Sequence, residues 1–357
     1  MFGERLQLAR KKAGLSLRGL ADAIGGQVTP QAIGKYERGE MMPSSTILIA
    51  LTKALGVSME FLAAPLEVRL GAIDFRKKSG TSARDRHHVE ATVLERVERY
   101  LLVEEVLELK SAAWTAPFTQ QTVITYEDAE KLAEKLRDKW GLGRDPIPDV
   151  TELLEEKGIK VMHLELPDDV SGLTCMIERE GIAPVPVIVV NSRHSVERRR
   201  LTLMHELAHR LMKVSDVDEE KGANRFASAF LMPALHLREQ VGKHRAAFGV
   251  AELMVMKRLY AVSAAALLVR LRDLGIITQQ TLAYAFQSFG RTWRKTEPQP
   301  IATTDADPRE VPQRFQRLCY RALAEGLITI SKASELLQEP VAAIDKEMRG
   351  AAVEDRR

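Results

Sequence analysis

Cysteine is scarce in this sequence, and long apolar runs are absent. The two cysteines, Cys175 and Cys319, lie far apart in the chain, which favours reduced core thiols of a cytoplasmic protein over a disulfide or a zinc site. No run of 18 apolar residues occurs, so no membrane-spanning helix is expected. The segment MFGERLQLARKKAG lacks the apolar centre of a signal peptide. The net charge of +3 is too small to indicate a nucleic-acid partner by itself.

Helical periodicity runs along most of the chain. Its 357 residues are 45% hydrophobic and 28% charged, which is ordinary for a globular protein with two or three domains. Three segments rich in β-branched residues, GIKVMHLEL, GLTCMIE and VPVIVVN, predict strands. Together these patterns predict a mainly α fold with a small β-sheet (α+β). The expected division is into residues 1–64, 65–120, 121–290 and 291–357.

The most informative stretch is an HExxH sequence formed by His205, Glu206 and His209. Apolar residues at helical spacing on both sides predict a helix. On a helix the two histidines point their imidazoles toward one metal ion. Glu206 lies about 100° around the helix axis from His205, where it can act as a base on metal-bound water. The alternative is a pair of hydrogen-bonded core histidines without a metal.

A zinc hydrolase needs a third protein ligand and keeps one position open for water. The position six residues after the second histidine is Ser215, which excludes the class that places a third histidine there. A helix resumes near Glu219, and its apolar face turns Glu220 inward with Glu219 close by. Periodicity does not choose between these glutamates, and Asp216 and Asp218 also stay open as ligands.

This stretch, RLTLMHELAHRLM followed by ExxANxFAxxFLMP, resembles the ImmA/IrrE family of zinc metallopeptidases. The order of small sheet and then HExxH helix is again similar to that family. The resemblance implies a zincin-like domain in which Zn2+ is held by His205, His209 and Glu220, with Glu206 as the catalytic base. It also implies a protein substrate, often a repressor of the Xre class.

The first 62 residues predict five short helices. Ser16 and Thr29 are N-caps of the second and third helices, and Pro30 occupies a first helical position where its missing N–H costs nothing. Gly25 and Gly26 supply the tight turn between these two helices. Two helices joined in this way form a helix-turn-helix unit.

Through GLSxxxLA and IGKYERGE this segment resembles the Xre/Cro-type DNA-binding domain. The resemblance implies that the third helix enters the major groove of double-stranded operator DNA. It would present Thr29, Gln31 and Lys35, while Lys35 and Arg38 would hold phosphates. Eight basic and five acidic residues give the segment weak electrostatic steering. The alternative is a protein–protein interaction module of the same shape.

Further helices connect and follow these two motifs. A helix from about residue 82 to 110 carries apolar residues near heptad spacing, which fits either a homodimer seam or packing within its own domain. Helical periodicity continues from Val250 to Leu274. Residues 315–338 predict two helices around Gly326 in a helical C-terminal region.

These observations predict a cytoplasmic, DNA-binding transcriptional regulator that carries a zinc-dependent endopeptidase domain. Its expected partners are an operator in double-stranded DNA, a protein substrate such as an Xre-type repressor, and a second copy of the chain. The alternative is a regulator or antitoxin-like protein whose zinc domain senses without proteolytic turnover.

Overall fold

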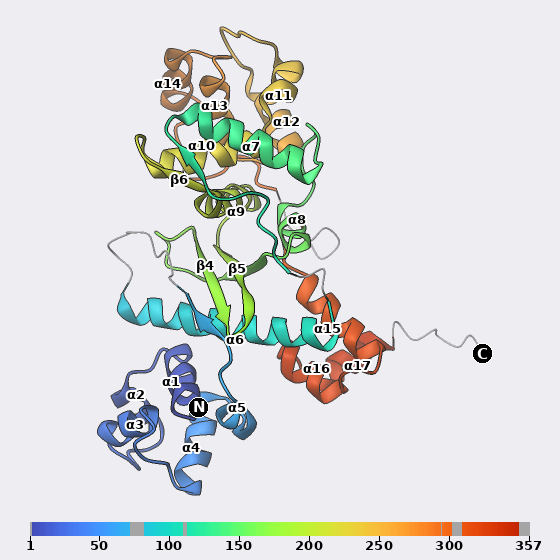
Figure 1. Cartoon of the computed structure of the whole chain (residues 1–357). Coiled ribbons are helices and arrows are strands. Elements are labelled where there is room, and N and C mark those ends of the chain that lie inside the picture. Colours follow the sequence, from blue (N-terminus) through green and yellow to red (C-terminus); the bar gives the residue numbers. More distant parts are fainter. Residues whose placement is uncertain (1, 72–81, 110–112, 294, 302–308, 350–357) are drawn as a thin grey trace, which may run out of the picture. The chain divides into compact units, whose positions relative to one another are not determined.

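The computed structural model describes residues 2–71, 82–109, 113–293, 295–301 and 309–349 (Figure 1). They form the mainly α architecture with small sheets that the sequence predicts. Among these residues, none of the helices combines the length and apolar character needed to span a bilayer. The chain divides into two compact units. Unit 1 contains Met1–Ala112, Cys175–Val185 and Arg314–Arg357, and unit 2 contains Ala113–Thr174 and Pro186–Gln313.

Unit 1 begins with a five-helix bundle, as predicted. Its helices are α1 (Phe2–Lys12), α2 (Leu17–Ala23), α3 (Pro30–Glu37), α4 (Ser45–Leu55) and α5 (Met59–Ala63). A serine or threonine side chain caps each of the last four helices, which satisfies a backbone N–H that has no partner inside the helix. Leu6, Leu20, Ile33 and Leu51 are fully buried at the centre of the bundle.

The long helix α6 (Ala83–Val106) is the scaffold of the rest of unit 1. Helix α1, helix α15 (Arg314–Ala324) and the short strand β1 (Arg69–Leu70) pack against it, and Val93 and Val97 are buried. Tyr100, Val103 and Leu107 share one buried core with Leu318 and Cys319 of α15. Of the two uses that the spacing leaves open, packing within the same unit is the one seen for these residues. The remaining helices of unit 1 are α16 (Ile330–Leu337) and α17 (Val341–Met348).

Two small sheets organise the strands. The first has the order β1-β4-β5-β3 and contains β3 (Lys160–Leu164), β4 (Gly172–Arg179) and β5 (Ile182–Asn191). Strand β3 is parallel to β5, and β1 is antiparallel to β4. The second sheet joins β2 (Gln121–Val123) and β6 (Met212–Val214) in parallel. Sequence patterns did not predict β1, β2 or β6, because two or three residues are too few for a period-2 signal.

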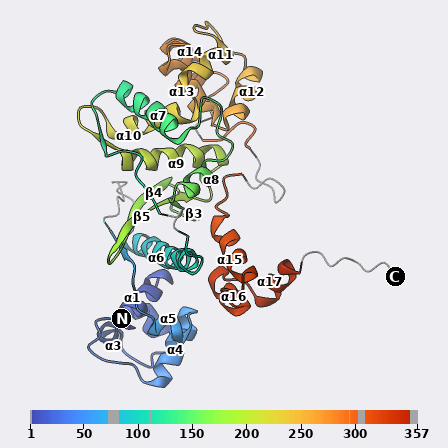
Figure 2. The same cartoon turned by 45° about the vertical axis from the view of Figure 1, so that its right-hand side comes forward.

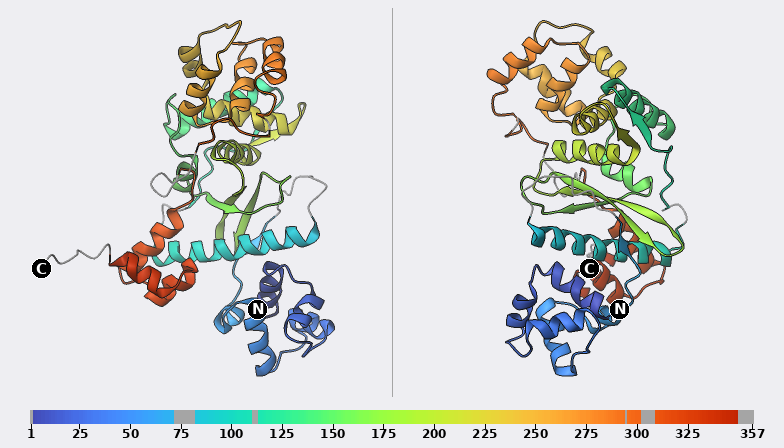
Figure 3. Two further views of the ribbon diagram at one scale, coloured as in Figure 1. Left: turned by 180° about the vertical axis from the view of Figure 1, so that it is seen from behind. Right: turned by 60° about the vertical axis from the view of Figure 1, so that its left-hand side comes forward.

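The helices of unit 2 enclose one continuous apolar core. Helix α10 packs against both α7 and α9 (Figure 2), and its Phe226 and Phe230 are fully buried. Figure 3 shows these helices from two further directions. The helices are α7 (Tyr126–Trp140), α8 (Val150–Glu156), α9 (Val196–Leu211), α10 (Glu219–Leu231), α11 (Ala234–Val241), α12 (Val250–Tyr260), α13 (Ala264–Asp273) and α14 (Gln279–Gln287).

The helical periodicity from Val250 to Leu274 corresponds to two helices in the structure, α12 and α13. Ala261 adopts a left-handed φ of 49° and ends α12. The side chain of Ser263 then accepts a hydrogen bond from Ala266 N and caps α13. The apolar periodicity survives the break because both helices face the same core, so periodicity alone could not reveal it.

Candidate metal centre and DNA-binding surface

Helix α9 carries the HExxH sequence in its C-terminal half. Ser195 caps the helix by accepting a hydrogen bond from Arg198 N. Leu203, Met204, Leu207 and Ala208 are fully buried, so the helix cannot rotate without exposing its apolar face. This packing fixes the direction in which the two histidines point.

A short strand sets the distance between α9 and α10. Directly after α9, β6 pairs with β2, and Gln120 Nε2 donates a hydrogen bond to Met212 O at 3.0 Å. Ser215 N donates to Val123 O at 3.1 Å. Asp218 then caps α10 by accepting from Lys221 N at 2.8 Å. These contacts fix β6 and the start of α10, and the first turn of α10 lies beside the histidines.

Donor atoms of His205, His209 and Glu220 lie within 4.8 Å of one another. The two Nε2 atoms are 3.1 Å apart, and Glu220 carboxylate oxygens lie 3.2 Å from His205 Nε2 and 3.8 Å from His209 Nε2. Neighbouring donors in a tetrahedral zinc shell are about 3.3 Å apart, because each lies ~2.0–2.1 Å from the ion. The three side chains therefore fit one metal ion and match the nitrogen and oxygen donors that zinc accepts.

Asn224 orients the first histidine. It lies one helical turn after Glu220, and its Oδ1 is 3.1 Å from His205 Nδ1. An amide oxygen only accepts, so Nδ1 carries the proton and Nε2 presents its lone pair to the other donors. Burial by itself lowers the pKa of His205, but the hydrogen bond with Glu220 and the charges of Glu206 and Glu220 outweigh it and raise that pKa. A proton would therefore compete with any metal ion at this histidine as the pH falls.

The site is open to solvent on the side of α10 and closed on the side of α9. The side chain of Glu220 is 58% exposed, whereas that of His209 is 3% exposed. Glu206 is buried at 9% exposure. Solvent therefore reaches the cluster over α10, while His209 and Glu206 are held by the core.

The other acidic residues near α10 take different positions. Asp218 is the N-cap of α10, and Asp216 accepts a hydrogen bond from Ser215 Oγ at 3.0 Å. Glu219 Oε1 lies 3.7 Å from Nδ1 of His209, away from the Nε2 atoms. Among the acids that sequence analysis left open, the geometry favours Glu220 as the third ligand.

Strand β4 runs close to the HExxH helix because Gly172 has no side chain. A Cβ at this position would lie 2.6 Å from Thr202 Cγ2, 2.8 Å from Val189 O and 3.4 Å from Glu206 Cγ. Farther along, Arg210 Nε donates to Thr174 Oγ1 at 2.9 Å. The start of β4 therefore flanks Glu206, a placement that sequence analysis did not anticipate.

Replacing Gly172 with alanine is expected to lower the free energy of unfolding by ~1–3 kcal/mol, because the added methyl group overlaps backbone and side-chain atoms. Chemical denaturation of the full chain measures this loss. Gly249→Ala is the matched control, since a Cβ there meets nothing within 4 Å. Equal losses in both variants would contradict the close approach of β4 to α9.

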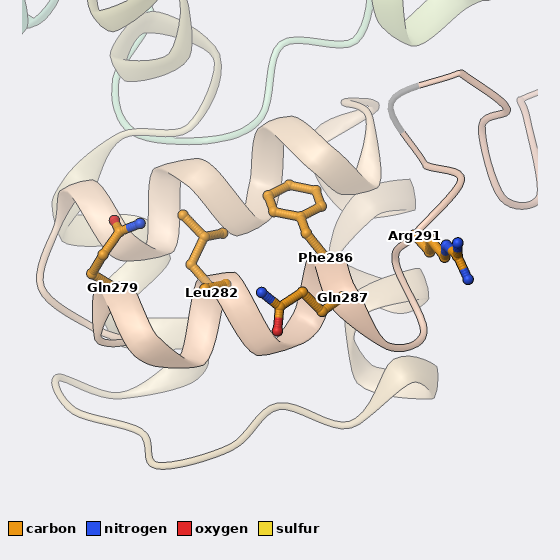
Figure 4. A pocket seen from close by; sticks show the side chains of 6 residues that line it. Gln279, Leu282, Phe286, Gln287 and Arg291 are labelled. Atoms are coloured by element: carbon orange, nitrogen blue, oxygen red, sulfur yellow. The ribbon is translucent and has the colours of Figure 1, made fainter.

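A separate cavity lies on α14. Gln279, Leu282, Phe286, Gln287 and Arg291 line it (Figure 4), together with Ala283. None of these residues belongs to the cluster of His205, His209 and Glu220, and no titratable pair converges on the cavity. The residue types give no indication of a reaction there.

The helix-turn-helix presents its third helix to solvent. Gln31 and Lys35 are exposed and four residues apart on α3, so they share one face. Thr29 is also exposed, and its Oγ1 caps the helix through Ala32 N at 3.2 Å. Arg38 is paired with Glu40 at 2.6 Å on the surface, so a phosphate would have to replace that carboxylate.

The buried face of α3 fixes the orientation of this helix. Ile33 and Tyr36 are buried in the bundle, and Arg10 on α1 holds Glu37 through two hydrogen bonds of 2.5 and 2.8 Å. The exposed face with Gln31 and Lys35 is therefore presented by a rigid helix. Such preorganisation is what major-groove recognition requires.

Comparison with known proteins finds two families along this chain. Residues 6–62 match the helix-turn-helix family, and residues 154–272 match the IrrE N-terminal-like domain of the M78 peptidases. The chain is 45% identical over 62 residues to YonR, an uncharacterized HTH-type transcriptional regulator derived from the SPbeta prophage of Bacillus subtilis (strain 168). That match covers 17% of this chain and 56% of the relative, so the chain spans about half the relative's length. The chain therefore contains an Xre-type helix-turn-helix domain and an IrrE-like domain of the M78 peptidase family.

Proposed function

We propose that this protein is a DNA-binding transcriptional regulator whose second domain is a zinc-dependent endopeptidase. The observation that carries the peptidase part is the convergence of His205, His209 and Glu220 donors within 4.8 Å, next to the HExxH glutamate. The match of residues 154–272 to the M78 family supports the same assignment. Residues 1–64 and 121–290 are the proposed functional domains.

Zinc, when bound there, supplies a Lewis acid for the scissile carbonyl and lowers the pKa of water to ~7. Glu206 takes up the proton that the attacking water loses and transfers it to the leaving amine. Burial of Glu206 keeps its carboxylate in one position, and the exposed side of Glu220 leaves room for a polypeptide. Asn224 holds the imidazole of His205 with its Nε2 toward the other ligands.

The edge of β4 suggests how a polypeptide would lie. Gly71 N pairs with Met176 O, and residues two apart in a strand direct their backbone groups to the same side. Thr174 and Gly172 therefore turn their N–H and C=O groups toward the edge at which, among the described residues, β1 pairs through Arg69 and Leu70. An extended substrate segment pairing there would pass beside Glu206. The proposed substrate is accordingly an extended region of a protein, such as an Xre-type repressor.

The peptidase proposal is tested by mixing the purified full chain with candidate Xre-type repressors and identifying fragments by mass spectrometry. A single cleavage position that disappears with a zinc chelator is expected. Metal binding without fragments from any candidate would instead favour a sensor or antitoxin-like role. We propose that the protein is cytoplasmic, so the same cleavage should also occur when the chain and a repressor are produced together in the cytoplasm of an expression host.

The DNA-binding proposal predicts separate effects for two residues of α3. Lys35→Ala is expected to weaken binding to all sequences and to reduce the slope of log affinity against log salt by about 1, since one phosphate contact is lost. Gln31→Ala is expected to cost ~1–3 kcal/mol at one base pair and to relax the preference there. Electrophoretic mobility shift with a selected operator at several salt concentrations measures both.

Lys53→Ala is the matched control for Lys35→Ala, because it removes the same charge from the exposed surface of α4. It should change the salt slope by less. No retention of double-stranded DNA by the full chain at low salt would leave only the interaction-module interpretation of the first domain.

A further inference from the structure

Helix α10 sets a side chain against each ring nitrogen of the two histidines. Glu220 faces both Nε2 atoms, and Asn224 faces Nδ1 of His205 at 3.1 Å. The fourth nitrogen, Nδ1 of His209, lies 3.7 Å from Glu219 Oε1. The two Nδ1 atoms thus have unequal neighbours: a neutral amide oxygen at hydrogen-bond distance from His205, and a carboxylate 3.7 Å from His209.

This inequality has a chemical consequence for a metal site. A histidine that coordinates through Nε2 carries its proton on Nδ1, and an acceptor for that proton makes Nε2 a stronger donor. A carboxylate is a stronger acceptor than an amide because the hydrogen bond is charge-assisted. We propose that Glu219 is a positioning residue that acts through His209, orienting its imidazole and strengthening Nε2 as a metal donor. This role rests on the proposed zinc site.

The geometry separates this role from that of a ligand. Glu219 approaches the ring from the Nδ1 side, whereas the other donors converge on Nε2. The two nitrogens of one imidazole diverge, so one ion cannot contact Nε2 and a carboxylate placed at Nδ1. The side chain of Glu219 is 45% exposed, and a movement of about 0.8 Å brings its oxygen to ordinary hydrogen-bond distance.

The test is the zinc affinity of the full-length Glu219→Gln variant, which keeps the size of the side chain and removes its charge. Competition with a chromophoric chelator should show a zinc affinity about 10–100-fold weaker than that of the wild type. This is about the effect of removing the hydrogen-bond partner of a metal-ligating histidine. The melting temperature of the metal-free variant should equal that of the metal-free wild type, and its rise on adding zinc should be smaller. The Co2+ form should keep the absorption spectrum of the wild type, because the ligands are unchanged.

Asp216→Asn is the matched control, since it removes an acidic charge three residues before Glu219 and should change zinc affinity less than ~3-fold. Equal affinity of Glu219→Gln and wild type would overturn the positioning role. So would complete loss of zinc from Glu219→Gln with retention by Glu220→Gln, because Glu219 would then be a ligand. A wild-type chain that binds no zinc at all would overturn the proposed metal site itself, which distinguishes the two failures.

Discussion

Replacing Glu206 with glutamine is expected to abolish the proposed cleavage of a protein substrate while leaving the metal content unchanged. Glutamine keeps the size of the side chain but cannot accept the proton that the attacking water must lose. General-base catalysis contributes ~100- to 10,000-fold to such reactions, so the cleavage rate should fall by at least about 100-fold. Time courses of repressor cleavage and elemental analysis of the same preparations measure the two quantities.

Glu134→Gln is the matched control for this variant. Glu134 is an exposed glutamate on α7, so its replacement should preserve cleavage. The assignment of Glu206 as the base fails if the Glu206→Gln variant cleaves at the wild-type rate. If it loses its metal instead, the loss of cleavage says nothing about a base, and Glu206 must be assigned a role in holding the site together.

Replacing Glu220 with alanine is expected to release the metal. Glu220 is one of three side chains whose donors converge, and zinc binding in four-ligand protein sites is worth ~10–16 kcal/mol, or about 3 kcal/mol per ligand. Losing one ligand should therefore weaken zinc binding by at least about 100-fold. Chelator competition measures the affinity, and cleavage should disappear in parallel.

A folding defect is a weak alternative explanation for that result, because the Glu220 side chain is 58% exposed and its removal leaves no buried cavity. Circular dichroism of the metal-free variant and wild type should coincide. Full retention of zinc by Glu220→Ala would show that another acid completes the site. Glu219, on the Nδ1 side of His209, would then have to be reconsidered.

Much of the architecture could be predicted because it depends on local signals. Ser16 and Thr29 cap their helices as expected, and the three segments rich in β-branched residues form β3, β4 and β5. The four-residue spacing of His205 and His209 by itself brings the two rings together once a helix forms. Caps, spacing and apolar periodicity lie within a few residues of each other, so sequence alone is sufficient.

The parts that could not be predicted depend on residues distant in sequence. The choice between Glu219 and Glu220 depends on how β6 leaves α9, and that path is set by pairing with Gln121–Val123. The need for glycine at position 172 appears only when β4 lies against Thr202. The partner of His205, Asn224, did have a signal, because it lies four residues after Glu220 and so shares its helix face.

The connector helix illustrates a further limit. Val93 and Val97 fall at a spacing that suits both a dimer seam and a buried scaffold helix, and the sequence cannot distinguish these uses. In the structure both valines are buried, and Tyr100, Val103 and Leu107 farther along the same helix share a core with α15. The expected homodimer therefore stays a prediction that requires another surface.

The most direct measurement is the metal content of the purified, untagged wild-type chain, determined by elemental analysis after dialysis against a weak chelator. We predict one zinc ion per chain, bound through His205, His209 and Glu220. A protein that is folded, retains no zinc and takes up none when titrated with it would contradict the central claim.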